Sequence, residues 1–426
     1  MCIRDRTYST PLSRPFPVDV AAGDTVRQSV LLEAATLEPQ EAVEAAAVAA
    51  AGDAGGPMVV TAHIGGESGR VPALAVVAGP QPGRLPAIPG LDAVLVELVE
   101  DSAGSDSSGS GRSGWAAQLH AAAAAAAVHG AGLDIRAVTA DPAGAAADLA
   151  PYLAEAKRLA VFHPASHVTE PDGWQEFKAS ARAAGFSGIL LAGTRAHFTE
   201  LNRDSSRTPS DSDALTFSIT PQMHSTEAAH IIDSLPMQRL AARNALRLAG
   251  GRPVHVGPVT LLPRFNAVAT SGVDDEAEAD ELQDQPFTAA WVLASISALT
   301  LDGVASVSYF EASGPRGISD AGGRLSPAGE LLKQLAALRD SVVLAVDVEA
   351  GQADADAVTV YPVRSPEGLV IFAGNLSGAA VAVDVRLPHS ASASAGDGDT
   401  APGRLALGPW SAGVVRFPAV DVPAPN

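Results

Sequence analysis

Two glutamates are candidates for catalysis, because each lies at or after the end of an apolar run of the kind that forms a buried strand. Glu200 lies in the polar segment 194–203, and Glu311 ends an apolar run. A pair of carboxyl groups suits acid and base work, since burial can keep one protonated while the other stays charged. We predict Glu200 and Glu311 as catalytic residues. In the alternative interpretation each only forms an ion pair, Glu200 with Arg203 and Glu311 with Arg316.

A histidine and several hydrogen-bonding side chains follow the same apolar runs. His224 is the third predicted catalytic residue, as a general base, a substrate donor or a metal ligand; alternatively, it caps a helix expected to start near residue 226. His255 lies inside an apolar strand, where a histidine buried in the core is the more common case. The predicted substrate-binding residues are polar side chains from these segments: Asn202, Arg203, Gln222, Arg264, Asn266 and Tyr309.

Several familiar catalytic patterns are absent from the sequence. It has no Gly-x-Ser-x-Gly nucleophile elbow, no P-loop, no His-Glu-x-x-His pair and no Gly-x-Gly-x-x-Gly after the first strand. Cys2 is the only cysteine, so cysteine-based zinc clusters are excluded. We predict no cofactor and assign no metal ligand, although the sequence leaves the use of a divalent metal open.

The chain is strongly acidic: 28 Lys and Arg residues stand against 48 Asp and Glu, a net charge of −20. A field of this sign repels nucleic-acid phosphates and anionic lipid headgroups, so we expect neither nucleic acid nor a membrane as partner. No uncharged apolar run has the length of a transmembrane helix, and no secretory signal is found. We expect a cytoplasmic protein that binds a small molecule; the oligomeric state is not predicted.

The elements that position these residues read as an α/β barrel. Apolar runs alternate with helical patterns, which is typical of βαβ units with a parallel sheet. Eight such runs predict a (β/α)8 TIM-like barrel over residues 71–340, with only a Pro-rich connector after the first strand. The predicted strands are 71–78, 91–99, 133–139, 159–164, 189–192, 214–220, 253–261 and 304–311.

Such a barrel places its reactive groups on the loops that follow the C-terminal ends of the strands. Glu200 and Glu311 follow strands three positions apart in the ring of eight, so their side chains can face each other across the mouth. We therefore expect Glu200, His224, Arg264 and Glu311 to surround one hollow.

The barrel is flanked by two predicted β-rich regions. Residues 1–70 read as the remnant of an N-terminal β domain, and residues 341–426 as a C-terminal antiparallel β-sandwich. The first six residues, MCIRDR, resemble the translated end of a sequencing adaptor. We exclude them from the fold and expect that a native N-terminal portion is missing.

Five separate segments, in the expected order along the chain, resemble the D-apionate lactonase family of bacterial apiose catabolism. The resemblance implies an N-terminal β domain, a TIM-type barrel and a C-terminal β domain, with hydrolysis of D-apionolactone to D-apionate. It implies no assignment of catalytic residues, and the chain departs from the family in lacking a longer N-terminal β domain. The segments are TYSTPLSRPFP at 7–17, TELNR at 199–203, TFSITPQMH at 216–224, AGGRPVHVGP at 249–258 and RFN at 264–266.

These observations together predict a lactonase. Glu311 is the predicted base and Glu200 or His224 the acid, while Arg264, Asn266 and Asn202 would bind the oxyanion and hydroxyl groups. One alternative is a barrel glycoside hydrolase that uses the paired carboxylates, although that clan typically places Asn immediately before its acid/base Glu. The other is a non-catalytic carbohydrate-binding protein, which an aromatic content of 4% disfavours.

Overall fold

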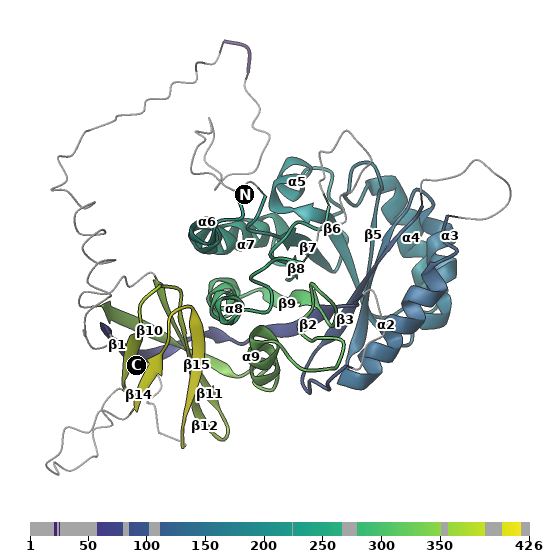
Figure 1. Ribbon diagram of the computed structural model, residues 1–426. Helices are drawn as coiled ribbons and strands as arrows, with labels where there is room; N and C mark the ends of the chain where they lie inside the picture. Colours follow the sequence, from purple (N-terminus) through teal and green to yellow (C-terminus); the bar gives the residue numbers. More distant parts are fainter. Residues whose placement is uncertain are drawn as a thin grey trace, which may run out of the picture.

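The computed structural model describes residues 21–23, 25, 58–79, 85–101, 111–223, 225–265, 279–350, 357–387 and 403–418. In this part of the chain, eight parallel strands close into a barrel and seven further strands form a second sheet beside it (Figure 1). Two of the predicted site residues, His224 and Asn266, lie outside the described residues, as does the segment 7–17.

The predicted (β/α)8 barrel is confirmed, and each of the eight expected strands is present. The first and last strands pair in parallel, which closes the ring. The strands are β2 (Ala73–Val77), β3 (Ala93–Val99), β4 (Gly132–Val138), β5 (Ala156–Phe162), β6 (Ile189–His197), β7 (Ala214–Ile219), β8 (Val254–Val259) and β9 (Val304–Glu311). β6 runs five residues beyond its expected end at Ala192, so the polar residues before Phe198 belong to a strand.

Helices cover the outside of the barrel. Several begin with proline at a position where no backbone N–H is required, and Asp141 and Ser326 cap two of them by accepting from Gly144 N and Gly329 N. The helices are α2 (Trp115–His129), α3 (Pro142–Leu149), α4 (Pro171–Ala183), α5 (Phe198–Arg203), α6 (Ala228–Asp233), α7 (Leu235–Ala249), α8 (Pro286–Leu299) and α9 (Pro327–Ala336). None of the helices in the described ranges combines the length and apolar character that a membrane crossing requires.

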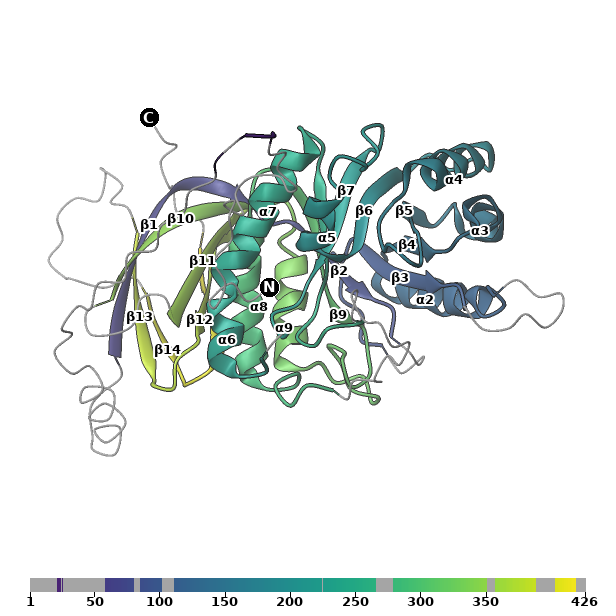
Figure 2. The same cartoon turned by 90° about the horizontal axis from the view of Figure 1, so that it is seen from above.

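Helix α8 is buried nearly all round because it lies between the barrel and the second sheet (Figures 1 and 2). Its side chains Trp291, Leu293 and Ile296 are fully buried. A helix that is apolar on every face needs partners on both sides. The barrel and the sheet therefore share one continuous core, which includes Phe372 of the sheet.

Where the sequence predicted a C-terminal antiparallel β-sandwich, the structure has a second, mainly antiparallel sheet of seven strands, and one of these strands comes from the N-terminal side. β1 (Met58–Arg70) pairs with the antiparallel β10 and the parallel β13, so the chain enters this sheet before it enters the barrel. The sequence had assigned this strand to a separate N-terminal β domain. The sheet order is β14-β13-β1-β10-β11-β12-β15. The C-terminal strands are β10 (Val342–Ala350), β11 (Val358–Ser365), β12 (Gly368–Asn375), β13 (Val381–Arg386), β14 (Gly403–Leu407) and β15 (Ser411–Phe417).

Candidate active site

Glu97 is the centre of an ion-pair cluster at the barrel mouth, although it was not among the predicted site residues. It lies near the C-terminal end of β3. Arg195 Nη2 donates to Glu97 Oε1 over 2.6 Å, and Arg264 Nη1 donates to the same oxygen over 2.9 Å. Burial acts to raise the pKa of Glu97, but the two guanidinium groups outweigh it and lower the pKa to about 2. The carboxylate therefore stays charged at any physiological pH.

Arg264 connects the ends of three other strands. Besides Glu97 on β3, its Nη2 donates to the Arg195 carbonyl oxygen on β6 over 2.9 Å and to Ser218 Oγ on β7 over 3.2 Å. Its side chain is 18% exposed. A guanidinium held by three partners keeps its position when charge develops on a ligand nearby, which is the property that oxyanion stabilisation requires.

An aromatic ring covers the second cation of this cluster. The Arg195 guanidinium lies 3.9 Å from the centre of the Phe265 ring, a distance typical of a cation–π contact. Phe265 also contacts the His167 ring, and the centres of the two rings lie 5.0 Å apart. These contacts fix Arg195 against Glu97, whereas Arg264 and Arg316 line a cavity.

Glu311 borders this cavity because β9 contains a bulge at its end. Val76 pairs with Tyr309 and Val77 pairs with Glu311, so Phe310 is an extra residue, and its φ is 42°. A bulge of this kind redirects the side chain that follows it. The cavity, of about 30 Å³, is lined by Glu311, Arg264 and Arg316 among others. Burial raises the pKa of Glu311 above its usual value, and the two arginines only partly oppose this.

Glu200 serves a local structural purpose in the first turn of α5. Its Oε2 accepts a hydrogen bond from the His197 backbone N–H over 3.2 Å, which satisfies a donor at the start of the helix. Arg203 Nη1 lies 3.9 Å from Glu200 Oε1. Burial raises the pKa of Glu200 as well. Both predicted carboxyl groups are thus shifted in the same direction, but only Glu311 shares a cavity with Arg264.

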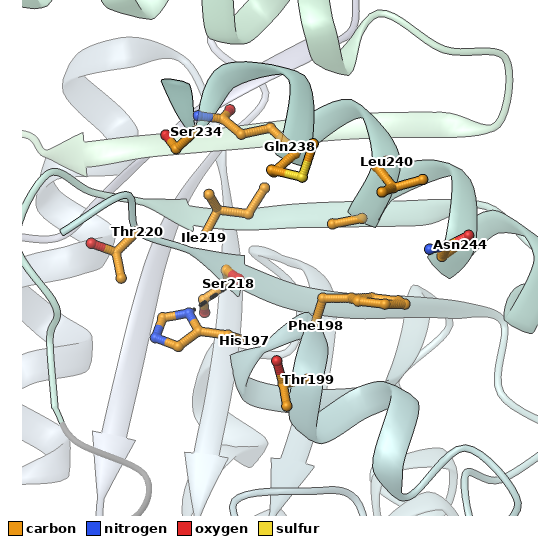
Figure 3. A pocket seen from close by; sticks show the side chains of 12 residues that line it. His197, Phe198, Thr199, Ser218, Ile219, Thr220, Ser234, Gln238, Leu240 and Asn244 are labelled. Atoms are coloured by element: carbon orange, nitrogen blue, oxygen red, sulfur yellow. Dashed lines mark hydrogen bonds between the residues drawn. The ribbon is translucent and has the colours of Figure 1, made fainter. Parts of the chain in front are cut away.

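A second and larger cavity, of about 70 Å³, lies between the ends of β6 and β7 and helix α7 (Figure 3). We call it the His197 cavity. The His197 ring forms one side with Ser218 and Thr220, and Leu240 and Asn244 of α7 form another. His197 Nδ1 lies 3.4 Å from the Ser218 carbonyl oxygen. Burial lowers the pKa of His197 to about 4, so its ring is neutral at pH 7.

The remaining predicted binding residues are dispersed. Gln222 is buried and donates to Asp280 Oδ2 over 2.6 Å. Asn202 is buried in α5, whereas Arg203 is half exposed on the same helix. The Tyr309 hydroxyl bonds Ser295 Oγ of α8 over 2.7 Å, on the helix side of the barrel wall. This last contact points the phenol away from the mouth, so we do not carry Tyr309 into the proposed site.

A column of charged groups fills the barrel below the mouth. Asp134 accepts from Arg136 Nε over 3.2 Å and from Arg158 Nε over 3.0 Å, and Arg158 Nη1 also donates to Asp92. His255 belongs to this column. Its Nδ1 lies 2.7 Å from Ser306 Oγ, as expected for a histidine buried in the core. Arg136 contributes to the lowered pKa of Glu97, so the column supports the electrostatics of the mouth.

Sequence reasoning missed Glu97, Arg195 and His197. A signal for Glu97 existed, since one acidic residue interrupts the apolar strand VLVEL at a position that alternation places on the same face as Ala93 and Leu95. Arg195 and His197 were assigned to a loop because β6 was expected to end at Ala192. In the described ranges, no group of three or more His, Cys, Asp or Glu side chains is arranged to hold a metal ion.

The barrel resembles several solved structures at low sequence identity, which is evidence for the fold alone. An α-L-arabinofuranosidase from Thermotoga maritima has a TM-score of 0.53 at 9% identity, covering 77% of this chain and 88% of its own. A conserved exported protein from Bacteroides fragilis has a TM-score of 0.51 at 8% identity, covering 83% and 99%. A family 30 xylanase from Clostridium acetobutylicum reaches 0.50 at 12% identity, covering 83% and 98%.

The sequence comparison is more specific. No curated protein sequence matches the chain. The family model described as "D-apionate lactonase, TIM barrel domain" matches residues 109–340, which is more than half of the chain and includes six of the eight barrel strands, β4 to β9. This agrees with the resemblance carried by the separate segments of the sequence, and it points to hydrolase chemistry. The chain belongs to the D-apionate lactonase family.

Proposed function

We propose that the protein hydrolyses a sugar lactone, and that this lactone is D-apionolactone, which water opens to D-apionate in apiose catabolism. The family membership supports a hydrolase. The observation that carries the lactonase proposal is the cavity that Glu311 and Arg264 share, because it places a carboxyl group with a raised pKa beside a fixed cation.

Lactone opening needs one group to accept a proton from water and another to hold the oxyanion that forms. In this proposal the carbonyl oxygen of the lactone approaches Arg264, and the Glu311 carboxylate takes a proton from a water molecule. The hydroxide oxygen adds to the carbonyl carbon, and Arg264 stabilises the resulting oxyanion. The bond to the ring oxygen then breaks, and that oxygen receives the proton from Glu311.

One carboxyl group can perform both transfers because burial raises its pKa. A glutamate at its ordinary pKa is a weak base at neutral pH, whereas a raised pKa makes it a better proton acceptor and keeps it a competent donor. Glu97 is unsuited to this task, since two guanidinium groups hold it ionised. Its part is to fix Arg195 and Arg264.

The other predicted residues have secondary places in this proposal. Glu200 holds the corner between β6 and α5 through the His197 backbone, so it acts as a positioning residue. His224 and Asn266 stay predictions, as residues that could supply a second proton-transfer group and a hydroxyl partner. Gln222, Asn202 and Arg203 stay predictions as substrate-binding residues.

The proposal is tested with a panel of aldonolactones, in which hydrolysis is followed by proton release at constant pH. We expect turnover of D-apionolactone to exceed that of the other lactones, and we expect no reducing sugar from aryl glycosides. If reducing sugar is released and no lactone is opened, the glycoside hydrolase alternative holds. Binding of intact D-apionolactone without turnover would instead support a non-catalytic binding protein.

A further inference from the structure

The cavity of Glu311 and Arg264 is lined by a second carboxyl group, that of Asp280, which the proposed reaction does not use. Asp280 belongs to the loop 279–285, which leads into α8, and it is partly buried. Two carboxyl groups therefore border the same cavity. Since Glu311 can perform both proton transfers, Asp280 is available for a different task.

Two hydrogen bonds hold the Asp280 carboxylate in place. Gln222 Nε2 donates to its Oδ2 over 2.6 Å, and the Leu282 backbone N–H donates to its Oδ1 over 2.7 Å. Gln222 is buried and follows β7, so the first bond connects the loop 279–285 to the end of another barrel strand. A side chain that is fixed from two directions loses little conformational freedom when it binds a ligand.

The same loop is also fixed to the segment that pairs with Glu311. Gln283 Nε2 donates to the Gly317 carbonyl oxygen over 3.3 Å, and Gly317 forms a parallel bridge with Glu311. Gln283 is itself buried and lines the cavity. The position of Asp280 relative to Glu311 is therefore set before a substrate binds, which is what a residue that determines specificity requires.

The hydrogen-bonding chemistry of Asp280 limits the groups that it can bind. A carboxylate only accepts, and each of its oxygens has about two acceptor positions. Bonds from the described residues take up one position on each oxygen of Asp280. The carbonyl oxygen and the ring oxygen of a lactone are acceptors too, so neither can bond to Asp280, whereas a hydroxyl group can donate to it. Arg264 only donates, and it suits the carbonyl oxygen instead.

We propose that Asp280 determines specificity in this cavity by accepting a hydrogen bond from a hydroxyl group of the lactone, while the carbonyl oxygen meets Arg264. This inference rests on the proposed function and goes further, because it assigns the recognition of a hydroxylated lactone to one side chain. A lactone without hydroxyl groups has no donor for Asp280, so it gains nothing from this contact.

The test compares D-apionolactone with γ-butyrolactone, which has no hydroxyl group, in the wild-type protein and in Asp280→Asn. The amide keeps the size of the side chain, and both bonds within the protein can persist, because Gln222 can turn its amide oxygen towards the new donor. The charged acceptor is lost. The ratio of kcat/KM for D-apionolactone over γ-butyrolactone should fall by roughly 10- to 100-fold, the range expected for a lost hydrogen bond to a charged group.

Two further variants separate recognition from support of the loop. Asp280→Ser keeps an acceptor for the Leu282 N–H and should lower the ratio at least as much, so it serves as a second variant if Asp280→Asn does not fold. Asp284→Asn changes an exposed acid of the same loop and should leave the ratio unchanged. An unchanged ratio in the folded Asp280 variants, or an equal loss of activity towards both lactones, overturns the proposal.

The assignment can also be tested where one or both lactones are not opened. If only D-apionolactone is opened, its kcat/KM should be at least tenfold lower in Asp280→Asn than in Asp284→Asn. If the wild-type protein opens neither lactone, the proposed function fails, and calorimetric binding of D-apionolactone then tests Asp280 alone. At least tenfold weaker binding to Asp280→Asn than to Asp284→Asn supports the assignment. Equal values in the two variants, or no binding to the wild-type protein, overturn it.

Discussion

Glu97 and Glu311 lie in the same barrel mouth and are both largely buried, yet their pKa values shift in opposite directions. Glu97 receives three charge-assisted hydrogen bonds from two guanidinium groups on one oxygen, and these outweigh the cost of burial. Glu311 has arginines nearby, but they do not compensate its desolvation. Burial alone therefore does not decide what a carboxyl group does. The number of cations that bond it directly separates an anchoring carboxylate from one that can transfer protons.

The largest effect is expected for Glu311→Gln. The amide keeps the size of the side chain but cannot accept a proton from water, so we expect kcat for D-apionolactone to fall by roughly 1,000-fold or more. The melting temperature should stay the same. The matched control is Glu200→Gln, which changes another mouth glutamate with a raised pKa and should cost less than tenfold. Equal losses in the two variants would remove the distinction between Glu311 and Glu200.

Replacing Arg264 tests the cation that the two glutamates share. Arg264→Met removes the donor for the oxyanion, and we expect kcat/KM to fall by roughly 100- to 1,000-fold, as for a lost oxyanion-hole donor. It also deprives Glu97 of one partner, so the protein should be less stable in urea. Arg324→Met, on an exposed loop, is the control for both measurements. Full activity in Arg264→Met would exclude the proposed oxyanion site.

Glu97→Gln should lower the free energy of unfolding, by an amount that depends on pH. The pKa of Glu97 is about 2 in the folded protein and near 4.5 without these partners. A lowered folded-state pKa contributes stability that is present above pH 4.5 and is lost as the pH falls towards 2. The contribution at pH 7 is on the order of 3 kcal/mol.

Urea unfolding at pH 7 and at pH 3 measures this contribution. The gap in unfolding free energy between the wild-type protein and Glu97→Gln should be large at pH 7 and clearly smaller at pH 3. Glu67→Gln, which affects an ion pair with Arg364 at the surface, should show a small gap at both values. A gap for Glu97→Gln that stays constant with pH would contradict the assignment of a charged anchor.

The acid limb of the pH profile of kcat/KM tests whether the pKa of Glu311 is raised. A base must be ionised, so kcat/KM should fall as the pH drops through the raised pKa of Glu311. Arg316 lowers this pKa, and Arg316→Met should therefore move the limb to higher pH, by up to roughly one unit. Arg324→Met should not move it. A shift towards lower pH would show that another group controls the limb.

The fold could be predicted from the sequence further than the site could. The alternation of apolar runs and helical patterns predicted eight strands, and all eight are present. β1 was misassigned because its partners, β10 and β13, lie hundreds of residues away, and strand pairing across that distance leaves no local pattern. The joint core around α8 could not be foreseen for the same reason.

Within the site, the order of the strands predicted that the segments carrying Arg264 and Glu311 lie close together. It did not predict which side-chain atoms form hydrogen bonds. The spacing of strands brought Arg264 and Glu311 together as expected. It could not foresee that a bulge at Phe310 redirects Glu311, or that Glu200 would bond its own helix start. Such details depend on backbone geometry at single residues, and that geometry is set by the packing of neighbouring strands.

The smallest effect is expected for Tyr309→Phe, and it tests the boundary between site and scaffold. The Tyr309 hydroxyl bonds only Ser295 Oγ among the described residues, so its loss should lower the unfolding free energy by about 1 kcal/mol and leave kcat/KM unchanged. Tyr361→Phe, which breaks a comparable bond to Thr300 at the sheet side of α8, should cost about as much. If Tyr309→Phe instead reduces turnover by tenfold or more at unchanged stability, the phenol reaches the substrate, and the functional mouth extends through the barrel wall towards α8.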